Sequence, residues 1–356
     1  MSNITEQLQK QILSASKSQK SLRIEGNNTK AFIGNASDGE IISSQRHQGV
    51  LSYDPSELVI KVRSGTRLDD INEVLAEHKQ SLPFEPNTFD GNATIGGTVA
   101  CNISGPARAY KGAARDYLLG ASIINGKAEV LQFGGQVMKN VAGYDASRLM
   151  AGAMGTLGFI LDVSIKVLPV NACEQTIKVQ RPVNDAIQLI NQLSAKNLPI
   201  NASAYIDDSL YIRLSSSEQN TIATSKIICQ QTGGSVIENS ETFWTSMTEQ
   251  QHDFFNTDKP IIRLSVPATC DTDTIECEQL IEWSGAQRWL KTETPVNKIR
   301  ELAKSLGGHA TAYKHFNDDI EYFQPLDAIN LKLQQRLKDA FDPACILNPG
   351  RLYKAF

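Results

Sequence analysis

Residues 92–106 read NATIGGTVACNISGP, a stretch of Gly, Asn, Thr and Ser with few long apolar side chains. It lies within a longer run, Pro83 to Gly112, that shows neither helical nor strand periodicity. Loops of this length are usually functional or disordered, and the regular elements on both sides favour a functional loop. Small side chains let a backbone approach a flat, extended ligand closely. The stretch is therefore a candidate ligand-binding segment, although surface turns have the same composition.

A second candidate loop reads GNNT at 26–29, after the short apolar piece Leu22–Ile24. Gly and Asn tolerate left-handed backbone geometry, so successive N–H groups of this loop can turn toward one anion. The loop is weak evidence by itself, because turns are commonly built from the same residues.

The usual nucleotide-binding fingerprints are absent. No G-x-G-x-x-G stands between a strand and a helix, since Gly152, Gly155 and Gly158 follow a helical stretch and precede a strand. A P-loop also fails, because Gly120 and Gly126 are one residue too far apart and Ala128 has no hydroxyl for Mg²⁺. Neither a Rossmann fold nor a P-loop fold is predicted.

Length and composition indicate an ordinary globular protein. A chain of 356 residues exceeds the usual size of one core, so two lobes are expected. The net charge of -4, without a clustered basic run, argues against a nucleic-acid partner. No apolar stretch is long enough to span a bilayer and no signal-peptide pattern is seen, so a cytoplasmic location is expected, with any membrane association indirect.

The cysteines and histidines do not suggest a metal site. The six cysteines are scattered without a C-x-x-C, which disfavours an iron–sulfur cluster or structural zinc in this chain. None of the histidines has the H-x-x-x-H or H-x-x-H spacing with an acidic neighbour that metal sites favour, and His309 is expected to belong to a turn and a strand start. No protein metal site is predicted.

The first lobe is expected to alternate helices and strands. A helix is predicted at 3–18, another from its cap at Thr66 to Glu77, and a third at 142–153. Strands are expected at Leu22–Ile24, Leu58–Val62, Leu118–Ile124, Val130–Phe133 and Leu161–Val167. Asn125-Gly126 predicts a hairpin between two of them. Pro169 ends the last strand, which places the first domain boundary near residue 170.

The second lobe is expected to be a smaller α+β unit. It has a helical stripe at 183–193, two strands within 205–214, a strand at 260–266 and a helix at 294–306, with Thr294 as its cap and Pro295 at its first position. This alternation predicts a ferredoxin-like sandwich. A final helix at 325–340 precedes a compact tail.

Six motifs follow one another along the chain: NATIGG at 92–97, NISGP at 102–106, RDYLLG at 115–120, MKNVAGYD at 138–145, GTLG at 155–158 and LNPGR at 347–351. In this order they resemble the vanillyl-alcohol-oxidase and p-cresol-methylhydroxylase (PCMH) family, and within it the FAD-binding subunits of bacterial glycolate oxidases. The resemblance covers the first 170 residues and the tail. It implies an α+β, two-lobed fold: a PCMH-type FAD-binding domain at 1–170, a ferredoxin-like cap domain at 171–324, and a C-terminal helix and tail at 325–356 that return to the flavin domain.

The resemblance also implies which residues bind FAD. The loop at 26–29 would hold the pyrophosphate, and the tail would lie near the flavin. The implied cofactor-binding residues are Gly26, Asn27, Asn28, Thr29, Pro86, Ile95, Gly96, Gly97, Ala100, Ser104, Gly105, Pro106, Arg108, Asp116, Gly158, Ile160, Asn348 and Arg351. Arg115 and Asp116 are alternatively expected to form a structural ion pair that holds their loop.

Two departures from the family pattern affect the chemistry. Asn27 and Asn28 stand where the family's pyrophosphate loop is richer in glycine, so weakened FAD binding is expected. The His-rich segment of related 2-hydroxy-acid dehydrogenases is missing, as is a histidine for covalent flavin attachment. Non-covalent FAD is therefore expected, and no catalytic residue is assigned.

The resemblance implies a subunit of a glycolate oxidase complex that oxidises glycolate to glyoxylate. Its expected partners are a larger flavin subunit and an iron–sulfur subunit, with indirect attachment to the inner membrane through them. Two alternatives stay open: a stand-alone FAD-dependent D-2-hydroxy-acid dehydrogenase, and a non-catalytic assembly subunit with a degenerate FAD site.

Overall fold

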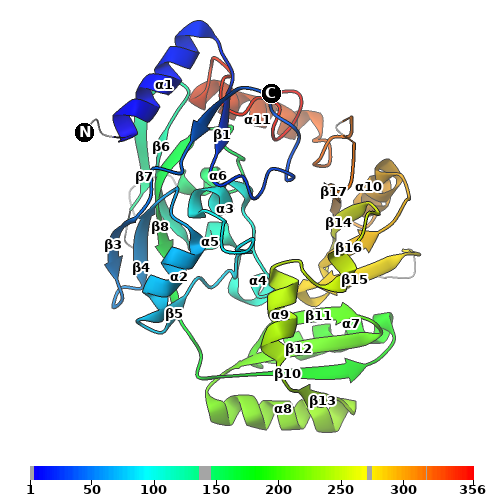
Figure 1. The fold of residues 1–356 in the computed structure, drawn as a ribbon. Coiled ribbons are helices and arrows are strands. Elements are labelled where there is room, and N and C mark those ends of the chain that lie inside the picture. Colours follow the sequence, from blue (N-terminus) through cyan, green and yellow to red (C-terminus); the bar gives the residue numbers. More distant parts are fainter. Residues whose placement is uncertain (1–3, 136–145, 271–274, 318) are drawn as a thin grey trace. The chain divides into compact units, whose positions relative to one another are not determined.

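The computed structural model describes residues 4–135, 146–270, 275–317 and 319–356 (Figure 1). The chain divides into two compact units. Unit 1 comprises Met1–Ile103, Ala113–Pro169 and Glu321–Phe356, and unit 2 comprises Ser104–Gly112 and Val170–Ile320. The MKNVAGYD motif at 138–145 lies outside the described residues.

Unit 1 is built on a five-stranded antiparallel sheet in the order β3-β4-β8-β6-β7. Its helices are α1 Ile4–Ser18, α2 Leu68–Ala76, α3 Ile95–Cys101, α5 Ala114–Tyr117, α6 Ser147–Met150 and α11 Ala328–Phe341. Its strands are β1 Leu22–Glu25, β2 Glu40–Ser43, β3 Val50–Asp54, β4 Val59–Arg63, β5 Gln80–Ser81, β6 Leu118–Ile124, β7 Val130–Gly134, β8 Phe159–Lys166 and β9 Leu168–Pro169.

The core of unit 1 forms where the sheet meets α2 and α3. Val163 and Ile165 of β8 are fully buried, together with Ile71 of α2 and Ile95 of α3. More polar residues separate these strand side chains, but Ser164 is buried too, so β8 is not the half-buried strand that its period of two predicts. The apolar face of the sheet therefore fixes where α3, the central helix of the candidate loop, comes to lie.

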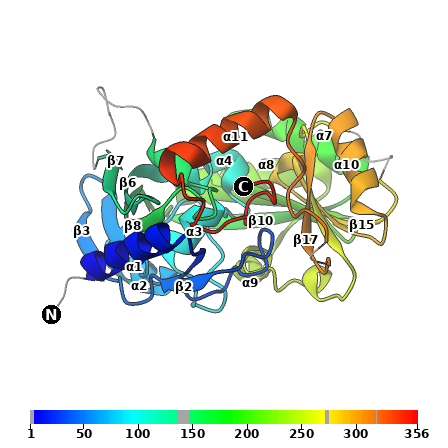
Figure 2. The same cartoon turned by 90° about the horizontal axis from the view of Figure 1, so that it is seen from above.

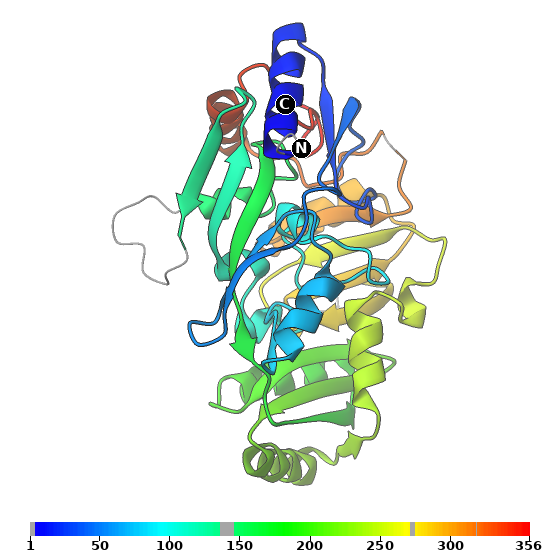
Figure 3. The same ribbon diagram turned by 60° about the vertical axis from the view of Figure 1, so that its left-hand side comes forward.

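A second, smaller cluster joins the two ends of unit 1. β1 and β2 form a parallel pair, and Leu22 of β1 bridges Leu347 of the tail. Both residues are fully buried with Ile12 of α1 and Phe159 of β8. Helices α1 and α11 consequently lie at the same end of unit 1 (Figures 1 and 3).

Unit 2 contains one eight-stranded antiparallel sheet in the order β13-β10-β12-β11-β15-β16-β14-β17. Its helical elements are α4 Arg108–Lys111, α7 Val183–Ser194, α8 Glu218–Thr232, α9 Ser240–Thr248, η1 Asp253–Phe255, η2 Trp283–Gly285 and α10 Val296–Ser305. Its strands are β10 Cys173–Gln180, β11 Ile200–Ile206, β12 Ser209–Ser216, β13 Ser235–Ile237, β14 Ile261–Ser265, β15 Glu278–Glu282, β16 Gln287–Lys291 and β17 His309–Lys314.

The sheet of unit 2 consists of two halves with the same strand order. From β10 to β13 the chain runs β-α-β-β-α-β, and its fourth, first, third and second strands are neighbours in that order, which is the ferredoxin-like arrangement. From β14 to β17 the strands have the same order, although no helix is described between β14 and β15, and the halves join where β11 pairs with β15. Helices α7, α8 and α10 cover one face, and α9 packs on the other (Figure 2). The expected ferredoxin-like unit is thus present, and its strand order is repeated in the second half.

Helix starts are where the sequence-based expectations are wrong. α2 begins at Leu68 with Arg67 as its N-cap, because the Thr66 hydroxyl donates to the Arg63 carbonyl instead. α10 begins at Val296 with Pro295 as its N-cap, so Thr294 is not the cap. In the described part of 142–153 only the single turn α6 is helical.

The long stretch Pro83 to Gly112, expected to lack regular structure, contains α3 and the short α4. By contrast, the hairpin around Asn125-Gly126 forms between β6 and β7 as predicted. Within the described residues no helix is long and apolar enough to cross a membrane.

Candidate functional site

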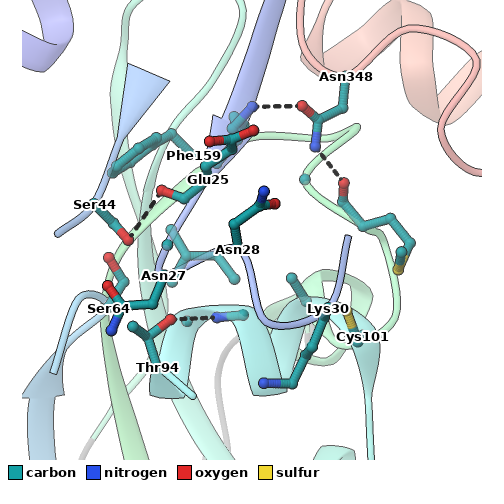
Figure 4. Close-up of a pocket in the computed structure, with 18 of the residues that line it drawn as sticks. Glu25, Asn27, Asn28, Lys30, Ser44, Ser64, Thr94, Cys101, Phe159 and Asn348 are labelled. Atoms are coloured by element: carbon teal, nitrogen blue, oxygen red, sulfur yellow. Dashed lines mark hydrogen bonds between the residues drawn. The ribbon is translucent and has the colours of Figure 1, made fainter. Parts of the chain in front are cut away.

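A groove in unit 1 is lined by six segments that are distant in sequence (Figure 4). It encloses about 730 Å³ of empty volume, which includes space open to solvent. The residues that line it are Ile24 to Ala31, Ser44, Ser64, Thr94, Gly96, Gly97, Ala100, Cys101, Met154, Gly155, Gly158 to Ile160, Asn348 and Arg351. The first candidate loop, the loop at 26–29 and the tail therefore converge on one groove.

The loop at 26–29 presents main-chain donors to this groove. The structure shows no protein acceptor, within the part of the chain it describes, for the N–H groups of Gly26, Asn27, Asn28 and Thr29. Asn28 has a left-handed φ of 58°, the geometry expected of it. Unpaired N–H groups around such a turn form a concave site for an anion.

Helix α3 forms a second wall. Thr94 is its N-cap, and its hydroxyl accepts a hydrogen bond from the Gly97 N–H at 3.3 Å. A Cβ on Gly96 would lie 2.6 Å from the Cβ of Ser64, so this wall approaches the end of β4 as bare backbone. Ser64 is 2% exposed, and its hydroxyl has no hydrogen-bond partner within the described residues. A buried hydroxyl without a partner in a groove wall suits a polar ligand.

The tail closes the groove from a third direction. The Asn348 side chain accepts from the Ile24 N–H at 2.6 Å and donates to the Met154 carbonyl at 2.6 Å. Arg351 donates to the carbonyls of Lys30, Ala31 and Asn35. Both tail residues therefore hold other walls of the groove in position, in addition to lining it.

A buried ion pair lies behind this arrangement. The Lys338 ammonium contacts the Asp342 carboxylate at 2.8 Å, the Thr156 carbonyl at 2.9 Å and the Leu347 carbonyl at 2.7 Å. Asp342 also accepts from the N–H groups of Ile346 and Leu347. Because Thr156 neighbours Gly155 and Leu347 precedes Asn348, the pair fixes two segments of the groove from outside it.

The groove carries charges of both signs. Lys30 is 6% exposed, and its ammonium lies 4.9 Å from the centre of the Phe89 ring. Burial raises the pKa of the Cys101 thiol, and the positive charges of Lys30 and Arg351 oppose that rise. Glu25 pairs with Arg23 at 2.7 Å. At neutral pH the Cys101 thiol is therefore protonated, and the two cations favour an anionic ligand.

Most of the residues expected to bind a cofactor line this groove. Those that line it are Gly26, Asn27, Asn28, Thr29, Gly96, Gly97, Ala100, Gly158, Ile160, Asn348 and Arg351. Pro86, Ile95 and Asp116 are not among the lining residues, and Ile95 is fully buried in the core of unit 1. Ser104, Gly105, Pro106 and Arg108 belong to unit 2, and their role stays a prediction.

The expected ion pair between Arg115 and Asp116 is not seen among the described contacts. The Asp116 carboxylate instead accepts from the Ala113 N–H at 2.9 Å, which caps the start of α5. A carboxylate in the first turn of a helix is favoured there by the orphan N–H groups. Asp116 thus has a local structural role.

Sequence reasoning missed several groove residues, notably Lys30, Ser44 and Ser64. Ser64 follows β4 directly and precedes Gly65. A small polar residue at the end of a predicted strand was therefore the one feature of the sequence that could have identified Ser64 as a groove residue. Nothing in the local pattern distinguishes Ser44 from other surface serines, since its position depends on the pairing of β1 with β2.

Comparison with known proteins agrees with this geometry. Residues 3–134 match the family described as FAD binding domain. The glycolate oxidase subunit GlcE of Escherichia coli K12 is 40% identical over 332 residues, which is 93% of this chain and 92% of that protein. The chain belongs to the family of FAD-binding glycolate oxidase subunits.

Other members and fold relatives are more distant. A D-lactate dehydrogenase of Anaerostipes hadrus is 34% identical over 131 residues, 37% of this chain and 27% of that protein. The glycolate oxidase subunit GlcD of Bacillus subtilis is 27% identical over 165 residues, 46% of this chain and 35% of that protein. An alkyldihydroxyacetonephosphate synthase structure has a TM-score of 0.68 at 14% identity, over 97% of this chain and 74% of that one. This likeness shows the fold, which is the two-lobed PCMH type.

The cofactor of this oxidoreductase family is FAD, and the groove suits it. Main-chain donors at 26–29 suit a pyrophosphate, and bare backbone at Gly97 leaves room for a flat ligand. At Gly158 a Cβ would lie 2.7 Å from Ile123, so a larger residue would disturb this wall. The residues present therefore fit the family's cofactor.

Proposed function

We propose that this chain is the FAD-binding subunit of a glycolate oxidase complex that oxidises glycolate to glyoxylate. The observation that carries the proposal is the groove with four main-chain N–H groups that have no acceptor among the described residues, in a chain 40% identical to GlcE over almost its whole length. Bound FAD supplies the two-electron redox chemistry that oxidation of a 2-hydroxy acid requires.

The residues of the groove bind and orient the dinucleotide. The N–H groups of 26–29 would neutralise the pyrophosphate, and Lys30 would add a positive charge beside it. Gly96, Gly97 and Ala100 would let α3 lie against the ligand, and the Ser64 hydroxyl would gain the partner it lacks. No histidine is among the described residues that line the groove, which supports non-covalent attachment.

The proposal assigns a role to each region of the chain. Residues 1–170 would form the FAD-binding domain, 171–324 the cap domain, and 325–356 the helix and tail that complete the flavin site. The contacts of Asn348, Arg351 and Lys338 with unit 1 support the last assignment. Residues 104–112 lie within the range 1–170 but belong to unit 2, so they would form part of the cap domain.

The relatives include two different glycolate oxidase subunits, GlcE and GlcD, so a multi-subunit arrangement is characteristic of this group. We propose that the partners are a larger flavin subunit and an iron–sulfur subunit. The complex would be cytoplasmic, with any attachment to the inner membrane made through those partners.

A stand-alone FAD-dependent D-2-hydroxy-acid dehydrogenase is the second candidate, favoured by the D-lactate dehydrogenase relative. Turnover of glycolate or D-lactate by the isolated chain with an artificial electron acceptor would support it. A non-catalytic subunit with a degenerate FAD site is the third candidate. The left-handed φ of Asn28 argues against it, because the turn that would bind the anion is formed.

The deciding experiment is an absorbance spectrum of the purified full chain before and after addition of FAD. We expect a flavin spectrum and release of FAD on acid extraction. Hydrogen exchange on the same sample should show protection at 26–31, 94–101 and 154–160 together when FAD is added. A chain that neither carries nor takes up FAD would refute the proposal.

A further inference from the structure

Glu25 is the one acidic residue among the described residues that line the groove of unit 1 (Figure 4). It directly precedes the loop at 26–29, whose main-chain donors suit an anion. A carboxylate repels a nearby pyrophosphate, because both are negatively charged. Its presence in the groove beside the cations Lys30 and Arg351 therefore requires a favourable contact that offsets this repulsion.

Hydrogen bonds fix the main chain on both sides of this side chain. The Ile24 N–H donates to the Asn348 side chain at 2.6 Å, and the Glu25 carbonyl accepts from the Ser44 N–H at 2.9 Å. Glu25 also pairs with Ser43 where β1 and β2 run parallel. The Glu25 side chain therefore starts from a defined point in the groove wall.

An ion pair orients the carboxylate. Arg23 and Glu25 are two residues apart in β1, so their side chains lie on the same face of the strand. The Arg23 Nε atom lies 2.7 Å from the Glu25 Oε1 atom. The Glu25 side chain is 16% exposed and that of Arg23 is 41% exposed. The pair thus holds one carboxylate oxygen in a position that is largely shielded from solvent.

The other carboxylate oxygen keeps its capacity to accept hydrogen bonds. No hydrogen bond to the Glu25 Oε2 atom is seen among the described residues. An ionised carboxylate accepts through both oxygens, and its charge strengthens the bonds that hydroxyl donors make to it. Ionised phosphate oxygens accept but do not donate. The groups of FAD that adjoin its pyrophosphate are the ribose and the ribityl chain, and both carry hydroxyl donors.

We propose that the Glu25 carboxylate accepts hydrogen bonds from the sugar hydroxyls of FAD that lie next to its pyrophosphate. The inference rests on the proposed function, because FAD is the ligand. In Rossmann folds a carboxylate binds ribose hydroxyls beside a pyrophosphate site, and here the same chemistry would arise on a different fold. Glu25 would thus be a specificity-determining residue, which selects a dinucleotide whose sugar hydroxyls are intact.

The test compares FAD with analogues that each lack one hydroxyl, in titrations of the full chain freed of FAD, followed by quenching of flavin fluorescence. Two analogues lack the 2′ or the 3′ hydroxyl of the ribose, and a third lacks the 4′ hydroxyl of the ribityl chain. The natural chain should bind at least one analogue about tenfold or more weakly than FAD, because a charge-assisted hydrogen bond is lost. The analogue that is affected distinguishes the ribose from the ribityl chain as the source of the hydroxyl.

Glu25→Met should remove this preference, so that FAD and the affected analogue bind with nearly equal affinity. The ratio of the two affinities is the decisive quantity. Loss of the negative charge also reduces repulsion of the pyrophosphate, but this effect changes both affinities alike and cancels in the ratio. Glu25→Gln keeps an acceptor oxygen without the charge, so it should retain part of the preference.

Arg23→Met is the matched control, because it breaks the same ion pair and leaves the carboxylate in place. Both variants should lose little stability, since Arg23 is partly exposed and solvent screens the pair. The preference for FAD over the affected analogue should persist in Arg23→Met. A thermal melt of each variant verifies that it is folded.

Equal affinity of the natural chain for FAD and all three analogues would overturn the inference. So would an unchanged preference in Glu25→Met, or a loss of preference in Arg23→Met as large as in Glu25→Met. The flavin spectrum of the natural chain reports the proposed function separately. A chain that takes up no FAD refutes both proposals, whereas a chain that binds FAD without distinguishing the analogues refutes only the role of Glu25.

Discussion

Asn28 shows how one residue decides whether the groove can bind an anion. It adopts φ 58° in the middle of the loop at 26–29, where the family pattern would have glycine. Asn can adopt this geometry because its side chain is short and polar and can form local hydrogen bonds. A β-branched side chain rarely adopts it. The loop therefore keeps its shape without the glycine.

Replacing Asn28 by Val should weaken FAD binding about tenfold or more, since forcing the left-handed geometry costs about 1–3 kcal/mol. Asn28→Gly should bind FAD at least as tightly as the natural chain. Titration followed by quenching of flavin fluorescence measures both affinities. Asn239 in unit 2 has φ 54° and serves as the control. Asn239→Val should lower stability and leave FAD affinity unchanged, and an equal loss in both variants would contradict a role specific to Asn28.

His47 gives unit 1 a dependence on pH. It is 7% exposed, its Nε2 atom has no partner within the described residues, and burial lowers its pKa, with Arg63 lowering it further. Because the folded pKa lies below the unfolded value, this contribution to stability is complete above pH ~6.5 and is lost as the pH falls through the folded pKa.

The free energy of unfolding should accordingly fall between pH 7.5 and pH 5, and His47→Asn should reduce that fall. Urea unfolding of both proteins at several pH values measures the difference. A variant whose pH profile matches that of the natural chain would show that His47 is not the group responsible.

At the scale of elements, α3 owes its place in the groove to two adjacent glycines with different surroundings. A Cβ on Gly96 would meet the Cβ and the carbonyl oxygen of Ser64 at 2.6 and 2.8 Å. A Cβ on Gly97 would meet only the Thr94 hydroxyl, at 3.3 Å. One glycine thus permits the helix to pack against the end of β4, and the other keeps the groove open.

Gly96→Ala should destabilise unit 1 by about 1–3 kcal/mol and lower FAD affinity, because α3 must move away from β4. Gly97→Ala should keep or raise stability, since alanine favours a helix by about 1 kcal/mol over glycine, yet still weaken FAD binding. Chemical unfolding and FAD titration separate the two effects. Unimpaired FAD binding in Gly97→Ala would place the ligand away from this wall.

At the scale of the whole molecule, unit 1 depends on contacts between segments that are far apart in the chain. Lys338 of α11 reaches Thr156 and Leu347, which are 182 and 9 residues away in sequence. Its side chain and that of Asp342 are 2% and 0% exposed, so their charges balance each other away from water. A buried pair of this kind costs most when one partner is removed.

Lys338→Met should therefore lower the free energy of unfolding by about 3–5 kcal/mol, because Asp342 is left buried without its cation. FAD affinity should fall as well, since the tail and the loop at 155–158 lose a shared anchor. Lys332→Met, on the exposed side of α11, should change stability by less than about 0.5 kcal/mol. A Lys338 variant as stable as the Lys332 variant would contradict this role of the ion pair.

Local chemistry explains what could be read from the chain before its structure. The hairpin at Asn125 and the glycine-rich and asparagine-rich loops are properties of neighbouring residues, and they are present in the structure. Helix starts were predicted less accurately. Thr66 and Thr294 have side chains that commonly cap helices, but the Thr66 hydroxyl donates to the Arg63 carbonyl, and Pro295 is the N-cap of α10 in place of Thr294.

The sequence alone determined the family, the two-lobed fold and most of the loops that line the groove, because left-handed geometry and small side chains are set residue by residue. Only the tertiary structure decided that Ser64 and Lys30 face the same space as the tail, and that Arg108 and Arg263 both lie over the Trp283 ring. These groups meet through sheet register and packing between segments far apart in the chain. No local sequence pattern predicts such contacts, because they depend on which buried surfaces the whole chain brings together.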